Sequence, residues 1–279
     1  MKAELRGVTY HYERRGTGEP LLFLHGFTGS MKTWHFLEAR FVRDYQLIFV
    51  DIIGHGHSES PKDFRRYAIN EVAKDLTALL DLLNIDKVHL IGYSMGGRLA
   101  LTFACLFPER IASLILESSS PGLKTEAERM ARRLRDQKLA ESICEDGIPA
   151  FVNRWENLEL FDSQKCLPES SRSALREQRL ANLSNGLSNS LIGMGTGAQP
   201  SWWKHLATLQ VPVLLITGAL DAKFCKIASE LCDRLPDADW QAVPDAGHAV
   251  HLEQPSDYQE RIHTFIQCQA LRLREENIK

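Results

Sequence analysis

A single stretch decides the fold of this chain: VHLIGYSMGGRLAL, residues 88–101. It starts with an apolar run typical of a buried strand and ends with helical spacing. Between them stands Gly92-Tyr-Ser-Met-Gly96, a G-x-S-x-G motif in the strand–turn–helix context of a nucleophile elbow. Glycines suit so sharp a turn, because neighbouring Cβ atoms would clash with it. We therefore predict that Ser94 stands at the carboxyl edge of a sheet, where the next helix N-terminus favours negative charge.

Apolar runs on either side of this stretch predict more strands of the same sheet. Unalternated runs of Val, Ile, Leu and Phe are typical of strands that are covered on both faces, as in a parallel sheet. Helical patterns lie between or after them: Asn70–Leu83, with Asn70 as its expected N-cap, and Pro255–Ile266. This alternation predicts an α/β fold. The runs are Leu21–Leu24, Leu47–Val50, Val88–Ile91, Ile111–Leu116 and Val213–Thr217.

The pattern changes between about Gly122 and His205. No Val/Ile-rich strand run occurs there, charged residues are dense, and helical spacing is clear over Thr125–Ala140. A stretch of this kind between two strand runs predicts a helical insertion in the sheet domain.

Two residues further along the chain complete a catalytic triad with Ser94. Asp221 follows the predicted strand Val213–Thr217, and His248 follows a short final strand. Asp221 could instead be a turn residue, and His248 a polar loop residue. The order Ser, Asp, His is nevertheless the one that this kind of strand–turn–helix site uses.

An oxyanion hole is predicted beside the triad. His25-Gly26-Phe27 follows the strand Leu21–Leu24, so the Phe27 backbone N–H can join that of Met95. Two such donors would stabilise negative charge that develops next to Ser94.

The composition limits the classes of protein to which this chain can belong. The chain has 279 residues, 44% of them hydrophobic and 25% charged, enough to form one large domain or two small ones. Its 33 basic and 36 acidic residues give a formal net charge of −3, which predicts neither nucleic acid nor an anionic membrane as a partner. Because no signal peptide and no membrane-spanning run is visible, we expect a cytoplasmic protein.

The cysteines and histidines predict neither disulfides nor a metal site. The six cysteines contain no CxxC pair, so reduced thiols are expected. His55-Gly-His57 and His248-Ala-Val-His251 have no nearby Cys or carboxylate at ligand spacing.

Together these motifs resemble the α/β-hydrolase superfamily over essentially the whole chain. The resemblance rests on EPLLFLHGF at 19–27, DIIGHGHS at 51–58, GYSMGG at 92–97 and DAGH at 245–248. It implies a mostly parallel eight-stranded sheet, no cofactor, a core of residues 1–120 and 206–279, and a helical lid at residues 121–205. Glu117 is a second candidate for the acid of the triad, because some relatives have their catalytic carboxylate at the end of the strand that corresponds to Ile111–Leu116.

Arg98 narrows the range of substrates that the site could accept. It lies one helical turn after Ser94, where ordinary esterases of this superfamily usually have a small or apolar residue. A guanidinium is costly to bury unless a carboxylate or another anion meets it. Arg98 therefore either pairs with an internal carboxylate such as Glu117 or binds a substrate carboxylate, a contact that contributes about 1.5–3 kcal/mol.

Arginines of the predicted lid allow the same two interpretations. Runs of arginine at helical spacing are often solvated faces, but above a cavity that already contains Arg98 they would suit a multiply charged acid. They are Arg129, Arg132 and Arg133 on one predicted helix, and Arg172, Arg176 and Arg179 on another.

Within the superfamily, the chain resembles the 2-succinyl-6-hydroxy-2,4-cyclohexadiene-1-carboxylate synthases of menaquinone biosynthesis. The motifs are GYSMGGRLAL at 92–101, SPGL at 120–123, ERMARRLRD at 128–136, FVNRW at 151–155 and, above all, SLIGMGTGAQPSWW at 190–203. In relatives an arginine commonly stands where this chain has Ile192. The resemblance implies carboxylate-binding arginines at Arg98, Arg132 and Arg179, a stacking tryptophan at Trp155 and an active-site tyrosine at Tyr93.

This resemblance implies a lyase reaction. Ser94, activated through His248 and oriented by Asp221, would remove a proton from the ring of 2-succinyl-5-enolpyruvyl-6-hydroxy-3-cyclohexene-1-carboxylate. Pyruvate would then leave, and the conjugated cyclohexadiene would form. The Phe27 and Met95 N–H groups would stabilise charge that develops on a substrate carboxylate.

Two other functions stay open. The triad suits a serine hydrolase equally well, either a carboxylesterase or a carbon–carbon bond hydrolase acting on an acidic substrate. A ligand-binding receptor on a decayed hydrolase scaffold generally lacks a triad member, and none is missing here. For the lyase we expect a small-molecule polycarboxylate substrate, no nucleic-acid or membrane partner, and a monomer or weak homodimer.

Overall fold

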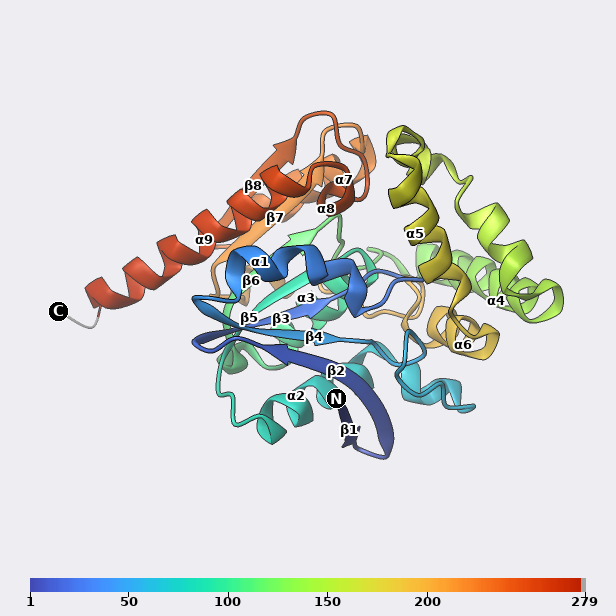
Figure 1. The fold of residues 1–279 in the computed structure, drawn as a ribbon, viewed down its shortest axis with the longest axis horizontal. Coiled ribbons are helices and arrows are strands. Elements are labelled where there is room, and N and C mark those ends of the chain that lie inside the picture. The colour runs from blue at the N-terminus through green and yellow to red at the C-terminus, as the bar shows by residue number, and fades with distance from the viewer. Residues whose placement is uncertain (277–279) are drawn as a thin grey trace.

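An eight-stranded sheet forms the centre of the molecule. The structure is a computed structural model that describes residues 1–276, with side chains through Leu271. The strand order is β1-β2-β4-β3-β5-β6-β7-β8 (Figure 1). Strands β3 to β8 are parallel, whereas β2 is antiparallel to both of its neighbours. The strands are β1 Lys2–Leu5, β2 Val8–Arg15, β3 Glu19–Leu24, β4 Tyr45–Val50, β5 Val88–Tyr93, β6 Ile111–Glu117, β7 Val213–Gly218 and β8 Ala238–Val243.

All five apolar runs predicted as strands belong to this sheet, so the predicted α/β fold is confirmed. Their lack of alternation follows from their position: every residue of β4 is buried, because helices cover both faces of the central strands. At the edge, β2 instead alternates buried and partly exposed residues over most of its length.

Helices form one layer on each face of the sheet. On one face lie α2 (Ile69–Leu82), α3 (Met95–Leu106) and α7 (Ala222–Cys232), whose apolar residues form one large core cluster. On the other face lie α1 (Glu38–Phe41) and α9 (Pro255–Glu276), and a second cluster contains Trp34, Phe41 and Tyr258. Short elements complete the chain: η1 Met31–Leu37, η2 Phe64–Tyr67, η3 Pro108–Arg110 and α8 Val250–Glu253.

The two helices predicted outside the insertion are present, but their ends differ from the prediction. Helix α2 begins at Ile69, and Ala68 is its N-cap, so the prediction of Asn70 as N-cap is wrong. The reason is local: the Glu71 and Val72 N–H groups both donate to the Ala68 carbonyl oxygen, which places Asn70 inside the first turn. Helix α9 continues past Ile266 because no Gly or Pro follows to end it.

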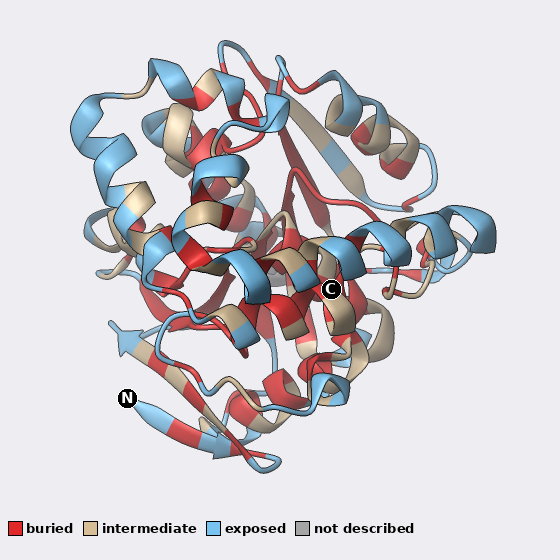
Figure 2. Ribbon diagram, turned by 90° about the vertical axis from the view of Figure 1, so that its right-hand side faces the viewer, coloured by how far each residue is buried: buried red, intermediate tan, exposed pale blue. Residues whose placement is uncertain are grey.

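The segment between β6 and β7 is helical, as predicted, and contains no strand. Figure 1 shows its helices grouped at one end of the sheet, and Figure 2 shows them exposed on their outer sides and buried where they face the molecule. A core of its own, with Ile143, Phe151 and Leu187, joins α4 to α6. Its elements are α4 Glu126–Trp155, η4 Glu159–Cys166, α5 Glu169–Leu180, α6 Ser184–Met194 and η5 Leu206–Thr208. Of the core segment predicted at 206–279, residues 277–279 lie outside the described residues.

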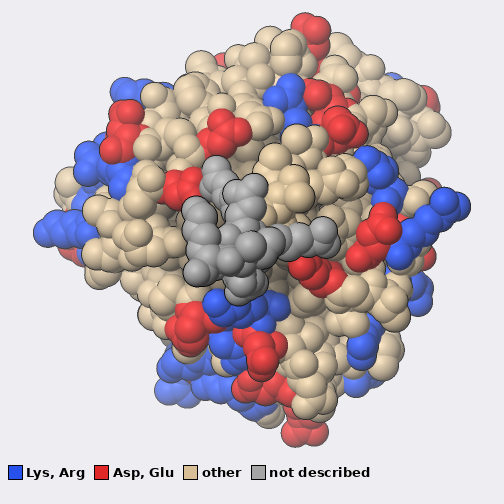
Figure 3. Space-filling model, turned by 90° about the vertical axis from the view of Figure 1, so that its left-hand side faces the viewer, with Lys and Arg blue, Asp and Glu red and all other residues tan. Residues whose placement is uncertain are grey.

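The surface carries both signs of charge. On the face shown in Figure 3, basic and acidic side chains are interspersed, which agrees with the small net charge of −3. Among residues 1–276, no helix is both long and apolar enough to cross a bilayer.

Candidate active site

The sharp turn after β5 fixes Ser94. The residue has φ 50° and ψ −105°, a region that non-glycine residues seldom occupy, and it immediately precedes α3. Its N–H donates to the Glu117 carbonyl oxygen of β6 at 2.9 Å. A Cβ atom on Gly96 would lie 2.1 Å from the Leu24 carbonyl oxygen, so only glycine lets α3 approach β3 this closely. The glycines thus hold Ser94 at the carboxyl end of the sheet.

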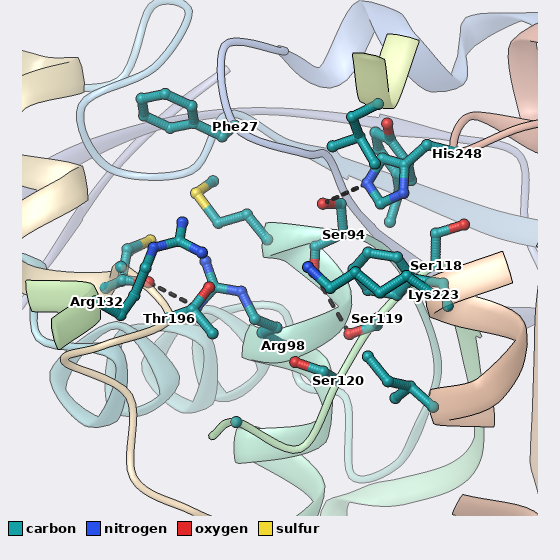
Figure 4. Close-up of a pocket in the computed structure, with 18 of the residues that line it drawn as sticks. Phe27, Ser94, Arg98, Ser118, Ser119, Ser120, Arg132, Thr196, Lys223 and His248 are labelled. Atoms are coloured by element: carbon teal, nitrogen blue, oxygen red, sulfur yellow. Dashed lines mark hydrogen bonds between the residues drawn. The ribbon is translucent and has the colours of Figure 1, made fainter. Parts of the chain in front are cut away.

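Ser94, His248 and Asp221 form a continuous chain of hydrogen bonds. The distance from His248 Nε2 to Ser94 Oγ is 3.1 Å (Figure 4), and that from His248 Nδ1 to Asp221 Oδ2 is 2.8 Å. Both His248 and Asp221 are buried. A proton on Nδ1 satisfies both bonds, because Nδ1–H then donates to the carboxylate and Nε2 accepts from the serine hydroxyl. A further hydrogen bond orients the acid: Asp221 Oδ1 accepts from Phe224 N–H, so that Asp221 also caps α7.

Glu117 lies at a different histidine. Its carboxylate accepts from the His251 N–H at 3.1 Å and lies 2.8 and 2.9 Å from His251 Nδ1, and both side chains are buried. The Tyr93 ring packs against both histidines, with centroid distances of 4.6 Å to His251 and 5.5 Å to His248. In the structure, His248 is therefore hydrogen-bonded to Asp221, and His251 is hydrogen-bonded to Glu117.

Two backbone donors lie free beside Ser94. A tight turn after β3, closed by Gly29 N–H to Gly26 O at 3.0 Å and with Thr28 at φ 68°, carries Phe27. Within the described part of the chain, neither the Phe27 N–H nor the Met95 N–H donates a hydrogen bond. Both residues line the cavity above Ser94, and Met95 is the first residue of α3. Such an arrangement can stabilise an oxyanion.

The cavity above Ser94 has a volume of about 210 Å³. Three basic side chains line it, namely Arg98, Arg132 and Lys223, and none of the described lining residues is Asp or Glu. Aromatic and aliphatic side chains form much of the remaining wall. A cavity with this charge favours an anionic ligand.

Arg98 is held by the insertion and not by a carboxylate. Its Nη1 donates to the Met194 carbonyl oxygen at 2.7 Å and to Gln199 Oε1 at 3.0 Å. Burial, followed by the charge of Arg132, lowers the pKa of Arg98 to about 10, so the side chain remains a cation at neutral pH. A salt bridge from Arg98 to Glu117, one of the two possibilities from the sequence, does not form.

In each of the two predicted groups of lid arginines, only one residue does more than form an ion pair at the surface. Arg132 lines the cavity, where its Nε donates to Asp136 Oδ1 at 2.7 Å. Arg179 is buried but does not line the cavity; it lies in an adjoining recess with Tyr93, Trp155 and Phe161. Its Nη2 donates to Gln164 at 3.1 Å, its Nε has no partner among the described residues, and burial lowers its pKa. The four others, Arg129, Arg133, Arg172 and Arg176, pair with glutamates.

Aromatic residues separate the cavity from that recess. Trp155, at the end of α4, contacts the Phe27 and Phe161 rings at centroid distances of 5.3 and 5.6 Å. Tyr93 lines both the cavity and the recess, and burial raises its pKa. Ile192, by contrast, packs against the core of the insertion and does not line the cavity.

Sequence reasoning missed Lys223 and Phe161. Lys223 lines the cavity beside His248, and Phe161 of η4 forms part of its wall. The signal for Lys223 was its place two residues after Asp221, at the start of a helix that begins beside the triad. Phe161 lies in a short 3₁₀ helix whose sequence has no motif, so only the tertiary structure could find it.

The chain matches the family model of the alpha/beta hydrolase fold over residues 19–255. Together with the sheet order and the elbow at Ser94, this match shows that the chain belongs to the α/β-hydrolase fold family. Within that family it closely resembles the 2-succinyl-6-hydroxy-2,4-cyclohexadiene-1-carboxylate synthases.

Three comparisons support that resemblance. A candidate synthase of this name from Bacillus subtilis (strain 168) is 47% identical over 262 residues, which cover 93% of this chain and 95% of the relative. The synthase of Enterobacter sp. (strain 638) is 33% identical over 236 residues, 85% of this chain and 87% of the relative. The structure of MenH from S. aureus has a TM-score of 0.89 and 34% identity, and covers 94% of this chain and 98% of its own.

Proposed function

We propose that this chain is a lyase that eliminates pyruvate from 2-succinyl-5-enolpyruvyl-6-hydroxy-3-cyclohexene-1-carboxylate to give 2-succinyl-6-hydroxy-2,4-cyclohexadiene-1-carboxylate in menaquinone biosynthesis. The observation that carries the proposal is the cavity above Ser94, with three cations and no carboxylate among its described lining residues. The substrate has three carboxylates. Its charge therefore matches the cavity, while a neutral ester would leave buried Arg98, which has no carboxylate partner among the described residues, without a counter-ion. The names of the similar synthases support the same reaction.

The triad supplies the base. His248 Nε2 takes the hydroxyl proton of Ser94, and Ser94 Oγ takes the proton from ring carbon C2. The electron pair of the C2–H bond forms the C2–C3 double bond, the C3–C4 double bond shifts to C4–C5, and the C5–O bond breaks. The proton on His248 passes to the leaving enolpyruvate, which becomes pyruvate. No acyl-enzyme forms, and Ser94 ends the cycle with its proton.

The oxyanion hole stabilises the enolate. Because C2 is next to the ketone of the succinyl group, negative charge develops on the ketone oxygen once the C2 proton leaves. We therefore assign the ketone oxygen to the Phe27 and Met95 N–H donors, in place of the carboxylate that the resemblance implied. Removal of one such donor typically costs about 10²- to 10³-fold in rate.

The arginines and aromatic residues bind the substrate in this proposal. Arg98 and Arg132 take the carboxylate of the succinyl group, and Trp155 and Tyr93 pack against the ring and its substituents. Arg179 takes part if a substrate carboxylate extends past Trp155 into the adjoining recess, where its Nε has no partner within residues 1–276.

The proposal includes four properties predicted from the sequence. Residues 121–205 act as a lid, because Arg132 and Trp155 of α4 both line the cavity from above the sheet. The enzyme works in the cytoplasm on a small molecule, as a monomer or weak homodimer. Size-exclusion chromatography with light scattering measures that oligomeric state directly.

The test is pyruvate release from the substrate, generated in place by the preceding pathway enzyme and followed with a coupled dehydrogenase. We expect release far above the spontaneous rate, and its loss in the Ser94→Ala variant. More than a few per cent of the rate in that variant would contradict the role of Ser94 as base. A burst of nitrophenol from short nitrophenyl esters, with Ser94 acylated and no pyruvate release, would instead support a serine hydrolase.

A further inference from the structure

Lys223 is a cation of the cavity without a counter-ion. It is the second residue of α7, lines the cavity together with Phe224 and His248, and forms no ion pair with any described residue. Its nearest ring contact is with Phe224, 5.2 Å from Nζ, and Phe224 in turn packs against His248 at 4.7 Å. An unpaired ammonium group at the mouth of a cavity can meet an anionic ligand there.

Lys223 and the two arginines approach Ser94 from different directions. In Figure 4, the main chain of Lys223 and the His248 ring lie on the side of Ser94 opposite Phe27 and Arg132, and the Lys223 side chain extends from there towards Ser94. The arginines also come from other elements, α3 and α4. The cations of the cavity therefore approach Ser94 from two directions, the arginines from α3 and α4 and Lys223 from α7.

The shape of the substrate assigns its carboxylates to these cations. Ring carbons C2 and C5 are opposite each other, so the succinyl group on C2 and the enolpyruvyl group on C5 point away from each other. With the succinyl ketone at the Phe27 N–H, the succinyl carboxylate extends towards Arg98 and Arg132. The enolpyruvyl group then lies on the side of His248 and Lys223.

We propose that Lys223 binds the carboxylate of the leaving enolpyruvyl group and so selects substrates that carry an acidic leaving group. This inference rests on the proposed function, because it takes its substrate from it. The ammonium group would also offset the negative charge that the departing enolpyruvate gains as the C5–O bond breaks. His248 lies on the same side, where its proton can reach that leaving group.

The experiment compares how two small carboxylates inhibit turnover. Formation of the diene product is followed by its absorbance, so that added pyruvate does not interfere with the measurement. Pyruvate probes the Lys223 subsite, and succinate probes the arginine subsite. In Lys223→Met we expect the inhibition constant for pyruvate to rise about tenfold and kcat/KM to fall about tenfold, with succinate inhibition unchanged. In Arg98→Met the inhibition constant for succinate should rise and that for pyruvate should stay the same.

Two further variants serve as controls. Lys223→Arg keeps the cation, so pyruvate inhibition should recover to within about threefold of the unaltered chain. Lys226→Met removes an exposed lysine of the same helix that does not line the cavity, and it should leave every constant unchanged.

The outcomes separate this inference from the proposed function. An unchanged inhibition constant for pyruvate in Lys223→Met, or no inhibition of the unaltered chain by pyruvate, overturns the assignment of Lys223. If the unaltered chain forms no diene at all, the proposed function fails. Calorimetry of pyruvate binding to the unaltered chain and to Lys223→Met then decides whether Lys223 forms a carboxylate subsite.

Discussion

At the scale of single residues, Asp221 has two separate tasks. One carboxylate oxygen accepts from His248 at 2.8 Å, and the other accepts from Phe224 N–H at 3.1 Å as the N-cap of α7. Asparagine is as good an N-cap as aspartate but cannot hold the histidine in the tautomer that accepts from Ser94. The two tasks can therefore be separated by one substitution.

Asp221→Asn should lower kcat for pyruvate release by up to about 10⁴-fold, the effect of this change in a comparable triad, while the melting temperature changes little. Asp221→Ala should lose both activity and stability, because the cap is lost as well. Steady-state kinetics and calorimetric melting measure the two properties separately.

Glu117→Gln is the matched control for that variant. The amide oxygen of glutamine can still accept from the His251 N–H groups, and His248 keeps its own carboxylate. We expect a loss of activity under tenfold. A loss as large as that of Asp221→Asn would make Glu117 a member of the catalytic machinery and contradict the assignment of the acid.

At the scale of elements, the kink in α4 determines where two cavity residues lie. Gly147 has φ 78° and ψ 169°, a conformation open almost only to glycine, and it divides the helix into two parts. The first part carries Arg132, and the second carries Trp155. Because both side chains line the cavity, the direction of the kink sets the distance between the charged and the aromatic contacts.

Gly147→Ala should lower the free energy of unfolding by about 1–3 kcal/mol and also raise KM, because relief of the strain would turn the two parts of α4 relative to each other. Gly7→Ala is the control: Gly7 has φ 81°, lies in the turn between β1 and β2, and has open space around its absent Cβ. Its substitution should cost stability without a change in KM. Equal KM values for all three proteins would show that the kink does not position the cavity.

At the scale of the whole molecule, buried histidines make stability depend on pH. Burial, followed by the charge of His25, lowers the pKa of His55 from 6.5 to about 3, and burial also lowers the pKa of His25. The rings lie 5.2 Å apart, and Asp51 is the carboxylate whose charge opposes both shifts. Below pH 6.5 the unfolded chain therefore binds a proton at His55 that the folded chain does not bind until the pH is near 3, and the pKa of His25 is shifted in the same direction.

The free energy of unfolding should be unaffected by protonation of His55 above pH 6.5 and should fall as the pH drops from 6.5 towards 3, because only the unfolded chain binds a proton at His55 in that range. For His55 alone, the loss between pH 7 and pH 5 is about 2 kcal/mol. Urea unfolding at the two pH values should show this loss in the unaltered chain and a smaller one in His55→Asn, whose amide can still donate to the Ile53 carbonyl oxygen. The same pH dependence in both proteins would disprove the contribution of His55.

The strands, and the three residues that form the hydrogen-bonded chain Ser94–His248–Asp221, could be predicted because their signals are local in the sequence. A strand buried on both faces needs a continuous apolar run, and a sharp turn that carries Ser94 needs glycines at fixed spacing. The N-cap of α2 was harder to predict. Whether Ala68 or Asn70 is the cap depends on which carbonyl oxygen accepts the first helical N–H groups, and only the structure shows that it is the Ala68 oxygen.

The sequence by itself determined the α/β fold, the helical insertion and the order of Ser94, Asp221 and His248, because each depends on periodicity or on a motif at the end of a strand. Only the tertiary structure decided which histidine Glu117 meets, that Arg179 lies behind the aromatic wall, and that Lys223 joins the arginines in one cavity. These outcomes depend on contacts between segments far apart in the chain, and side-chain direction and packing across such contacts leave no local pattern in the sequence.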